Sequence, residues 1–286
     1  MRSRLKAAMA VLVTALTLGA MTAAPAAAVT GGTPDGDAHP NVGLILFYDG
    51  TGRFRCSATL VTPTVLLTAA HCTDGTKGKT LVDFRSVVKE TGPSSGYAAA
   101  ADPANGYTQA EIEAAGFRSG TAYTHPEYSD FTDLDNWNDV GVIVLDRPVT
   151  GIEPAKIAPL NYLDDYAQPR LNKTIFTSVG YGTEVRKPDS GPQKPTPMTF
   201  PLIRRYADQP GQKLTDQILQ LNGNPNDTKG TGGTCFGDSG GPTFLNGYLV
   251  TVTSYAYTDN CRYLGGYQRV DIEVAQDWLA PFLATS

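Results

Sequence analysis

Charged side chains are scarce in this chain of 286 residues, at 18% against about 25% in an ordinary globular protein. This shortage excludes a charge-rich disordered chain and argues against a nucleic-acid-binding one. Glycine and proline are plentiful, at 30 and 20 residues, but follow no fixed period, which excludes collagen and argues against long helices. With 41% hydrophobic residues, the composition indicates a turn-rich globular protein with one or two cores.

The first 28 residues have the pattern of an export signal. Arg2, Arg4 and Lys6 form a basic start before the apolar run 7–20, and small residues follow. The apolar run is short for a bilayer, so we predict a removed signal rather than a membrane anchor. Removal would leave 258 residues from Val29 and would shift the net charge from −5 to −8, because three basic and no acidic residues are lost. We therefore expect a secreted, extracellular protein that binds neither nucleic acid nor, after signal removal, a membrane.

Cysteine is also scarce, and no two of the four cysteines have a C-x-x-C spacing. In an exported protein an even number of cysteines indicates disulfides. Cys56, Cys72, Cys235 and Cys261 allow three pairings, of which Cys56–Cys72 with Cys235–Cys261 joins sequence neighbours. Each of these local bonds would contribute about 3 kcal/mol by chain entropy. A zinc site of four thiolates is the alternative, and the spacing disfavours it.

The residue pattern predicts an all-β protein. Residues 53–60 alternate polar and apolar side chains, with the period of two that marks a half-buried strand. Other candidate strands are rich in Val, Ile, Thr and Tyr and lie at 42–48, 65–68, 140–145, 174–179, 248–253 and 266–270. A break at 146–159 with three prolines divides the mature chain into two predicted domains, 29–150 and 151–286, which follow the signal peptide at 1–28.

Helices are expected in two places. Asp271 is positioned to cap a terminal helix whose apolar residues share one face, and residues 109–115 fit one short helix. The segment 85–120 otherwise has no strand rhythm. Four prolines within 186–197 predict a stiff, exposed loop there.

Three histidines limit any acid–base chemistry. His39 and His125 lie in turn-like segments, and we interpret both as surface residues. His71 follows the hydrophobic strand 65–68 and two small residues, and it directly precedes Cys72. A histidine held at the end of a packed strand beside a disulfide has the rigidity that a general base needs. His71 is therefore the candidate base, with a purely structural histidine as the alternative.

The segment most indicative of chemistry is Gly-Asp-Ser-Gly-Gly-Pro at 237–242. Its glycines leave the hydroxyl of Ser239 bare and the backbone N–H groups open to a ligand oxygen. The pattern Gly-x-Ser-x-Gly also fits α/β-hydrolases, but there the histidine follows the serine, and no histidine follows Ser239. The order histidine, aspartate, serine fits another scaffold. Asp139, before the apolar strand 140–145, is positioned to accept the N–H of His71.

Two acidic clusters have a metal site as an alternative interpretation. The loop 130–135 contains three aspartates but lacks the ligand spacing of a calcium loop, so we interpret it as solvated charge. Asp35, Asp37 and His39 form only a weak candidate ligand set. We predict no metal.

Three motifs together resemble the chymotrypsin/trypsin family of serine proteases. They are Thr-Ala-Ala-His-Cys at 68–72, Asn-Asp-Val at 138–140 and the serine motif at 237–242, in this order. Lesser similarities, at 29–32, at 180–182, at 254–256 and in the terminal helix, run the length of the mature chain. The resemblance implies an all-β fold of two six-stranded antiparallel β-barrels (chymotrypsin-like) with a C-terminal helix and the site between the barrels.

The same resemblance implies the role of each site residue. Ser239 attacks the scissile carbonyl, His71 takes and returns its proton, and Asp139 orients the imidazole and stabilises its charge. The backbone N–H groups of Gly237 and Ser239 form the oxyanion hole. The implied activity is hydrolysis of proteins or peptides by a monomer, without a cofactor.

Activation in this family depends on an ion pair between the new amino terminus and the aspartate beside the nucleophile. In this chain those groups are Val29 and Asp238. The predicted signal cleavage falls directly before Val29. We therefore expect export itself to generate the active amino terminus.

The pocket for the side chain before the scissile bond is expected to be neutral. Gly233 stands where trypsin-like members have an aspartate, so the partner that Lys or Arg needs is missing. Ser254, Tyr255 and Ala256 match the substrate-pairing strand, and the methyl group of Ala256 narrows the pocket while Gly265 leaves the other wall open. This predicts cleavage after aromatic or medium aliphatic residues.

Two other functions fit the same residues. The first is a catalytically silent, protease-like binding protein, although such proteins usually lose a triad residue and this chain keeps all three. The second is an esterase or another acyl hydrolase, which the match to the substrate-pairing strand disfavours.

Overall fold

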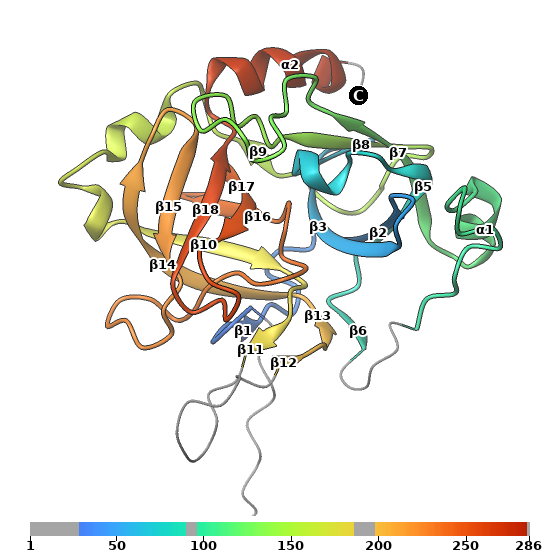
Figure 1. The fold of residues 1–286 in the computed structure, drawn as a ribbon, viewed down its shortest axis with the longest axis horizontal. Coiled ribbons are helices and arrows are strands. Elements are labelled where there is room, and N and C mark those ends of the chain that lie inside the picture. The colour runs from blue at the N-terminus through green and yellow to red at the C-terminus, as the bar shows by residue number, and fades with distance from the viewer. Residues whose placement is uncertain (1–28, 90–95, 186–197, 285–286) are drawn as a thin grey trace, which may run out of the picture.

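The computed structural model describes residues 29–89, 96–185 and 198–284. The predicted signal peptide and the predicted proline-rich loop at 186–197 lie outside these ranges. Within them, strands dominate and form two barrels that lie side by side (Figure 1).

The first barrel is closed and has six antiparallel strands in the order β2-β3-β4-β8-β7-β5. Its strands are β2 (Val42–Tyr48), β3 (Arg53–Thr62), β4 (Val65–Thr68), β5 (Lys77–Asp83), β7 (Arg118–Thr124) and β8 (Gly141–Leu145). Alternation of polar and apolar residues begins β3, whereas β2 and β4 are apolar runs that are buried along their whole length.

The second barrel closes through the pairing of β14 with β15 and has the ring order β14-β10-β16-β17-β18-β15. Its strands are β10 (Ile175–Gly180), β14 (Arg205–Leu214), β15 (Ile218–Asn222), β16 (Pro242–Leu245), β17 (Tyr248–Ala256) and β18 (Leu264–Arg269). Two short strands extend it, namely β1 (Thr33–Pro34) beside β14 and β9 (Lys156–Ile157) parallel to β17. The predicted fold of two six-stranded antiparallel barrels with a C-terminal helix is confirmed.

Short elements connect and cover the barrels. They are β6 (Val87–Lys89) paired with β13 (Leu202–Ile203), β11 (Glu184–Val185) paired with β12 (Met198–Thr199), the 3-10 turns η1 (Ala70–Cys72), η2 (Tyr162–Tyr166) and η3 (Leu171–Lys173), and the helices α1 (Gln109–Ala114) and α2 (Glu273–Ala284). Across the described ranges, neither helix combines the length and the apolar character needed to cross a membrane.

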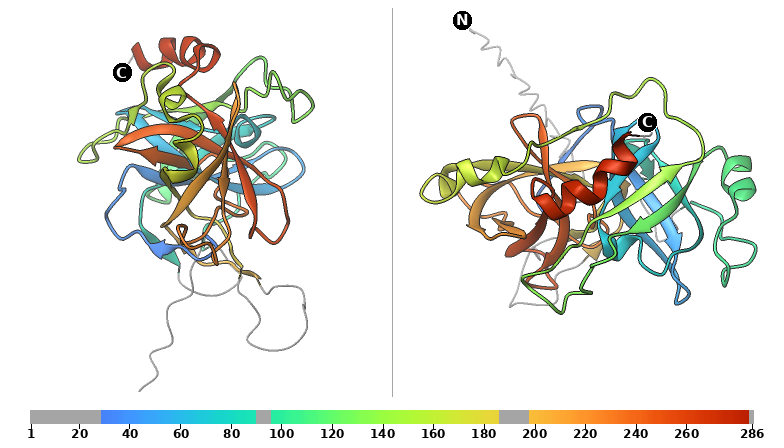
Figure 2. Two further views of the ribbon diagram at one scale, coloured as in Figure 1. Left: turned by 90° about the vertical axis from the view of Figure 1, so that its left-hand side faces the viewer. Right: turned by 90° about the horizontal axis from the view of Figure 1, so that it is seen from above.

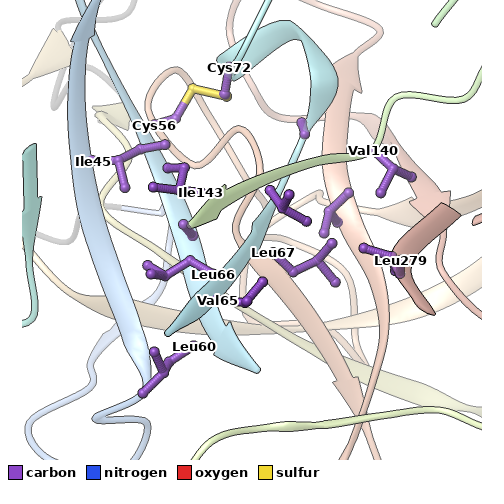
Figure 3. Packing of buried hydrophobic residues seen from close by; sticks show 14 of the residues in the cluster. Ile45, Cys56, Leu60, Val65, Leu66, Leu67, Cys72, Val140, Ile143 and Leu279 are labelled. Carbon is purple, nitrogen blue, oxygen red and sulfur yellow. A yellow bond between two sulfur atoms is a disulfide. The ribbon is translucent and has the colours of Figure 1, made fainter. Parts of the chain in front are cut away.

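Helix α2 lies across the junction of the two barrels when the molecule is seen from above (Figure 2). Its Leu279 is fully buried in the same apolar cluster as the first barrel's Leu66, Val142 and Ile143. Figure 3 shows this cluster between Leu279 and the Cys56–Cys72 disulfide. The terminal helix therefore joins the second half of the chain to the core of the first.

Two expectations about this region are wrong. His125 is 4% exposed, because α2 covers its turn and Trp278 lies 5.1 Å from its ring. Asp271 does not cap α2, since its carboxylate accepts hydrogen bonds from the Leu163 N–H and from Arg269 instead. Both outcomes depend on tertiary contacts that a local pattern does not contain.

Candidate active site

His71 is the middle residue of η1, the turn that follows β4 in the first barrel. The preceding Ala69 and Ala70 are fully buried, and the next residue, Cys72, is bonded to Cys56 on β3. The second disulfide joins Cys235 to Cys261, so the local pairing is the one formed and no thiolate is left for zinc. The disulfide and the two buried alanines fix the backbone of the histidine on both sides.

Asp139 is fully buried and holds His71 through two hydrogen bonds. Its Oδ1 accepts the backbone N–H of His71 at 2.9 Å, and its Oδ2 lies 2.8 Å from His71 Nδ1. Oδ2 also accepts the hydroxyl of Ser254 at 2.6 Å, and Trp137 Nε1 donates to the same hydroxyl at 2.9 Å. Three donors from the two barrels thus fix the orientation of the carboxylate.

The environment of His71 changes its proton affinity in two opposing ways. Burial lowers the pKa of the imidazole, but the charge of Asp139 and the hydrogen bond to it raise this pKa by more. The net pKa of His71 therefore lies above its usual 6.5. A histidine of this kind is a stronger base, and it stays charged up to a higher pH.

Ser239 lies in a glycine-rich turn of the second half, opposite His71. Gly237 and Gly240 have φ angles of +99° and +74°, which other residues rarely adopt. Among the residues that the structure describes, no acceptor takes the N–H of Gly237 or of Ser239. Ser239 and His71 line one cavity of about 520 Å³ between the barrels, hereafter the cleft. Within the described ranges no hydrogen bond joins the Ser239 hydroxyl to the His71 ring.

Ser57 on β3 is a residue of this site that the sequence did not single out. Its buried Oγ donates to the Gly237 carbonyl at 2.9 Å and accepts the Tyr181 N–H at 3.0 Å. Its own N–H donates to the Ser239 carbonyl at 2.8 Å. The side chain of Ser57 therefore fixes Gly237, and the backbone N–H of Ser57 fixes Ser239. These are the two residues whose own N–H groups are unpaired. The only sequence signal was its place beside Cys56 in an alternating strand.

For the peptide hydrolysis that the sequence predicts, we expect Ser57→Ala to lower kcat about fivefold, because the Gly237 peptide loses a fixing hydrogen bond worth about 1 kcal/mol. KM should change little, since Ser57 does not line the cleft. The variant also leaves the Tyr181 N–H buried without a partner, which should lower the unfolding free energy by about 1–3 kcal/mol. Steady-state kinetics on a peptide substrate and urea unfolding measure the two effects.

Thr59→Val is the matched control, because Thr59 lies two residues along the same strand and its buried hydroxyl has no partner. This change should preserve both kcat and stability. Ser57→Thr restores the hydroxyl and should recover part of kcat. Equal kcat for wild type and Ser57→Ala would contradict the role given to Ser57.

Asp238 is fully buried, and its carboxylate accepts the N–H groups of Gly182 and Cys235 at 2.7 and 2.8 Å. A side chain on Gly180 or on Gly182 would collide with this carboxylate, which explains both glycines of the 180–182 motif. Burial raises the pKa of Asp238 to about 7, despite the lowering effect of the two N–H groups.

Val29 is fully buried. The carbonyl of the next residue, Thr30, accepts the N–H of Gly233 at 2.9 Å. The nitrogen of Val29 is a peptide nitrogen in this chain of 286 residues, so it has no charge to offer Asp238. The ion pair between the two stays a prediction about the processed chain.

A second cavity, the side pocket, has a volume of about 230 Å³ and shares Ser239 and Phe236 with the cleft. The predicted pocket residues Ser254, Tyr255 and Ala256 line it, whereas Gly233 and Gly265 do not. Gly233 packs closely against the backbone of Gly223, and Gly265 on β18 pairs with Ala256 on β17. Sequence reasoning missed Thr234 and Phe236, which do line the pocket. No charged side chain is among its lining residues in the described part of the chain.

The other candidate ligand sets have protein partners. Asp35 Oδ2 accepts Arg204 Nε at 2.7 Å and its Oδ1 lies 2.5 Å from His39 Nδ1, so a buried arginine rather than a metal neutralises it. Asp133 in the loop 130–135 accepts the N–H of Asp135 at 2.9 Å and the amide of Asn136. His39, interpreted as a surface residue, keeps only 26% of its side chain exposed because of the Asp35 contact.

Comparison with known proteins agrees with this architecture. The family model described as Trypsin matches residues 35–279. Brachyurin from Leptuca pugilator is 29% identical over 241 residues, covering 82% of this chain and 89% of its own length. Trypsin from Saccharopolyspora erythraea is 28% identical over 223 residues, covering 76% of this chain and 81% of its own length.

Solved structures share the fold at lower identity. HL collagenase superposes with a TM-score of 0.60 at 17% identity, covering 88% of this chain and 96% of its own. An inactivated protease paralogue of the scabies mite has a TM-score of 0.57 at 16% identity, covering 89% and 100%. Since the family model spans most of the sequence and both barrels, this chain belongs to the trypsin family.

Proposed function

We propose that the protein is a secreted serine endopeptidase that hydrolyses peptide bonds through Ser239, His71 and Asp139. The observation that carries the proposal is that the buried Asp139 carboxylate holds the His71 ring at 2.8 Å in the same cleft as Ser239. Membership of the trypsin family supports it. The substrates are proteins or peptides, the protein acts as a monomer, and no cofactor takes part.

In the proposed mechanism the hydroxyl of Ser239 attacks the peptide carbonyl while His71 Nε2 takes its proton. Asp139 keeps Nδ1 protonated and stabilises the imidazolium that forms. The unpaired N–H groups of Gly237 and Ser239 receive the negative oxygen of the tetrahedral intermediate. His71 then gives the proton to the leaving amine. In the second half of the reaction water attacks the acyl-enzyme while His71 takes a proton from the water, and His71 returns this proton to the Ser239 oxygen as the acid product leaves.

The side pocket takes the substrate side chain that precedes the scissile bond. Its wall is neutral, and a Lys or Arg side chain buried there would lack a counter-charge. Aromatic and medium aliphatic residues are therefore the preferred class.

Digestion of an unfolded peptide mixture by the chain beginning at Val29, followed by mass spectrometry of the products, tests both activity and specificity. The expected products end in Phe, Tyr, Leu or Val. Products that end mainly in Lys or Arg would refute the neutral pocket and leave the endopeptidase proposal intact. A lack of cleavage in any unfolded substrate would favour the alternative, a protease-like binding protein.

Signal removal is proposed to activate the enzyme by freeing the amino group of Val29 to pair with Asp238. We call a chain that keeps residues before Val29 the extended chain. In its folded state Asp238 has a raised pKa of about 7, so the folded state holds a proton that the unfolded state releases above about pH 4. Stability of that chain should fall by about 1.4 kcal/mol per pH unit as pH rises from about 4 to 7. A freed amine lowers the pKa of Asp238 and removes this fall.

Two inactive chains carrying Ser239→Ala make the comparison without self-digestion. One begins at Val29 and the other retains residues 26–28, and urea unfolding at pH 4 to 7 gives the stability of each. The extended chain alone should lose stability with rising pH. Parallel stability curves for the two chains would refute the ion pair.

A further inference from the structure

Arg55 stands beside the turn that carries Gly237 and Ser239. Side chains alternate along β3, so Arg55 and Ser57 project on the same side of the strand. Ser57 reaches the Gly237 carbonyl, and Arg55 lies one step further out: its Nε is 2.8 Å from the point where a Cβ on Gly237 would stand. Arg55 also lines the cleft with His71 and Ser239. Its guanidinium therefore faces the reacting centre.

The guanidinium of Arg55 is half-buried, yet in the described ranges it forms no hydrogen bond and no ion pair. Its neighbour on the strand, Arg53, differs, because it donates to the carbonyls of Tyr97 and Ala98 and to the hydroxyl of Tyr107. Arginine presents a planar set of donors that matches a carboxylate, and a partly desolvated cation without a partner is unfavourable. Arg55 is thus a cation that lacks its anion.

The acidic groups near Arg55 do not supply this anion. Burial lowers the pKa of Arg55, and the field of Asp238 only partly opposes this, since the Asp238 oxygens accept two backbone N–H groups and make no ion pair with Arg55. Asp49 also lines the cleft, but its Oδ1 accepts the N–H and the hydroxyl of Thr51 at 2.7 Å within its own turn. The remaining place for a carboxylate is the open cleft.

The cleft is the side of the site through which the leaving segment runs, if the proposed function holds. The side pocket receives the residue before the scissile bond, and among the described residues it shares only Ser239 and Phe236 with the cleft. His71, which protonates the leaving amine, lines the cleft and not the side pocket. Residues after the scissile bond therefore pass Arg55.

We propose that Arg55 binds a carboxylate on the substrate segment that follows the scissile bond. This proposal rests on the proposed endopeptidase function and adds a substrate class to it. The carboxylate belongs either to an Asp or Glu side chain in the first two positions or to the end of a short peptide. The exposed rings of Phe54 and Phe236, which also line the cleft, reduce the water around the ion pair and thereby strengthen it.

Fluorogenic peptides that are identical up to the scissile bond test the proposal. One pair has Asp or Asn at the first two following positions, and another ends there as a free acid or as an amide. Wild-type kcat/KM should favour the charged member of at least one pair about tenfold or more. The first pair should differ in kcat/KM if Arg55 binds a side-chain carboxylate. The second pair should differ in kcat/KM if Arg55 binds the carboxylate of the chain terminus. Arg55→Met should remove the preference, and Arg55→Lys should keep part of it.

A uniform loss with Arg55→Met, equal for charged and neutral peptides, would overturn the proposal, because it would mean that Arg55 acts on Asp238 instead. A wild-type ratio near one in both pairs would also overturn it while leaving the endopeptidase proposal intact. Binding of the same peptides to the Ser239→Ala chain, measured by fluorescence anisotropy with and without Arg55→Met, gives the answer even without cleavage. Equal affinities for acid and amide members would refute the carboxylate site.

Discussion

Replacement of Ser239 by Ala is expected to lower kcat about a millionfold, the loss typical when a serine protease loses its nucleophile. The hydroxyl is the only group of the protein that bonds to the carbonyl carbon in the proposed mechanism, so no acyl-enzyme forms without it. Substrate affinity should stay close to that of the wild type, because the side pocket and the unpaired N–H groups remain. The ratio of kcat values on one fluorogenic peptide measures the loss, and peptide binding to the variant measures what is retained.

The structure also predicts that this change leaves stability unaltered, since the Ser239 side chain forms no hydrogen bond in the described ranges. Thr228→Ala is the control, because it removes an exposed hydroxyl that lines neither the cleft nor the side pocket and should preserve kcat. If Ser239→Ala kept more than about a thousandth of the wild-type kcat, another group would have to be the nucleophile. That outcome would refute the assignment of Ser239.

The strands that sequence patterning located are those in which hydrophobic burial alone decides the structure. The predictions for β2 and β4 match Val42–Tyr48 and Val65–Thr68 to the residue, because both strands are unbroken apolar runs in the core. Strand β14, Arg205–Leu214, was missed. It contains Pro210 and five charged or amide side chains, and it is a strand because β10 and β15 pair with its two sides.

The candidate site was readable to the extent that its chemistry lies in short motifs. His71, Asp139 and Ser239 came from local residue order, and the structure brings the first two together across 68 residues of sequence. The unpaired Arg55 and the role of Ser57 did not come from the sequence. Their significance lies in which residue of the other barrel each meets, and a single strand's pattern does not contain that information.

The electrostatics of the site were equally out of reach. Nothing in the sequence indicated that the pKa of Asp238 would rise to about 7, because the shift comes from complete burial between the barrels. The buried pair of Asp35 with Arg204, 169 residues apart, shows the same limit. A local pattern made Asp35 a weak metal ligand, whereas the fold provides it with an arginine.

Asp139→Asn is expected to lower kcat about ten-thousandfold, the cost of holding a catalytic histidine in the wrong tautomer. The carboxylate keeps the proton on His71 Nδ1 and leaves Nε2 free to take the proton of Ser239. An amide at position 139 would present donors to Nδ1 and favour the proton on Nε2. Asp133→Asn is the matched control, since its carboxylate is exposed and should not affect kcat.

The same substitution should shift the acidic limb of the kcat/KM profile to lower pH. A base must be neutral to act, so wild-type activity falls as pH drops through the raised pKa of His71, which lies above 6.5. Without Asp139 nothing raises this pKa, and burial alone then lowers it. Kinetics of both enzymes from pH 5 to 9 measure the shift. If the acidic limb of the kcat/KM profile lay at the same pH in the wild type and in Asp139→Asn, Asp139 would not set the proton affinity of His71. That result would refute the proposed role of this carboxylate.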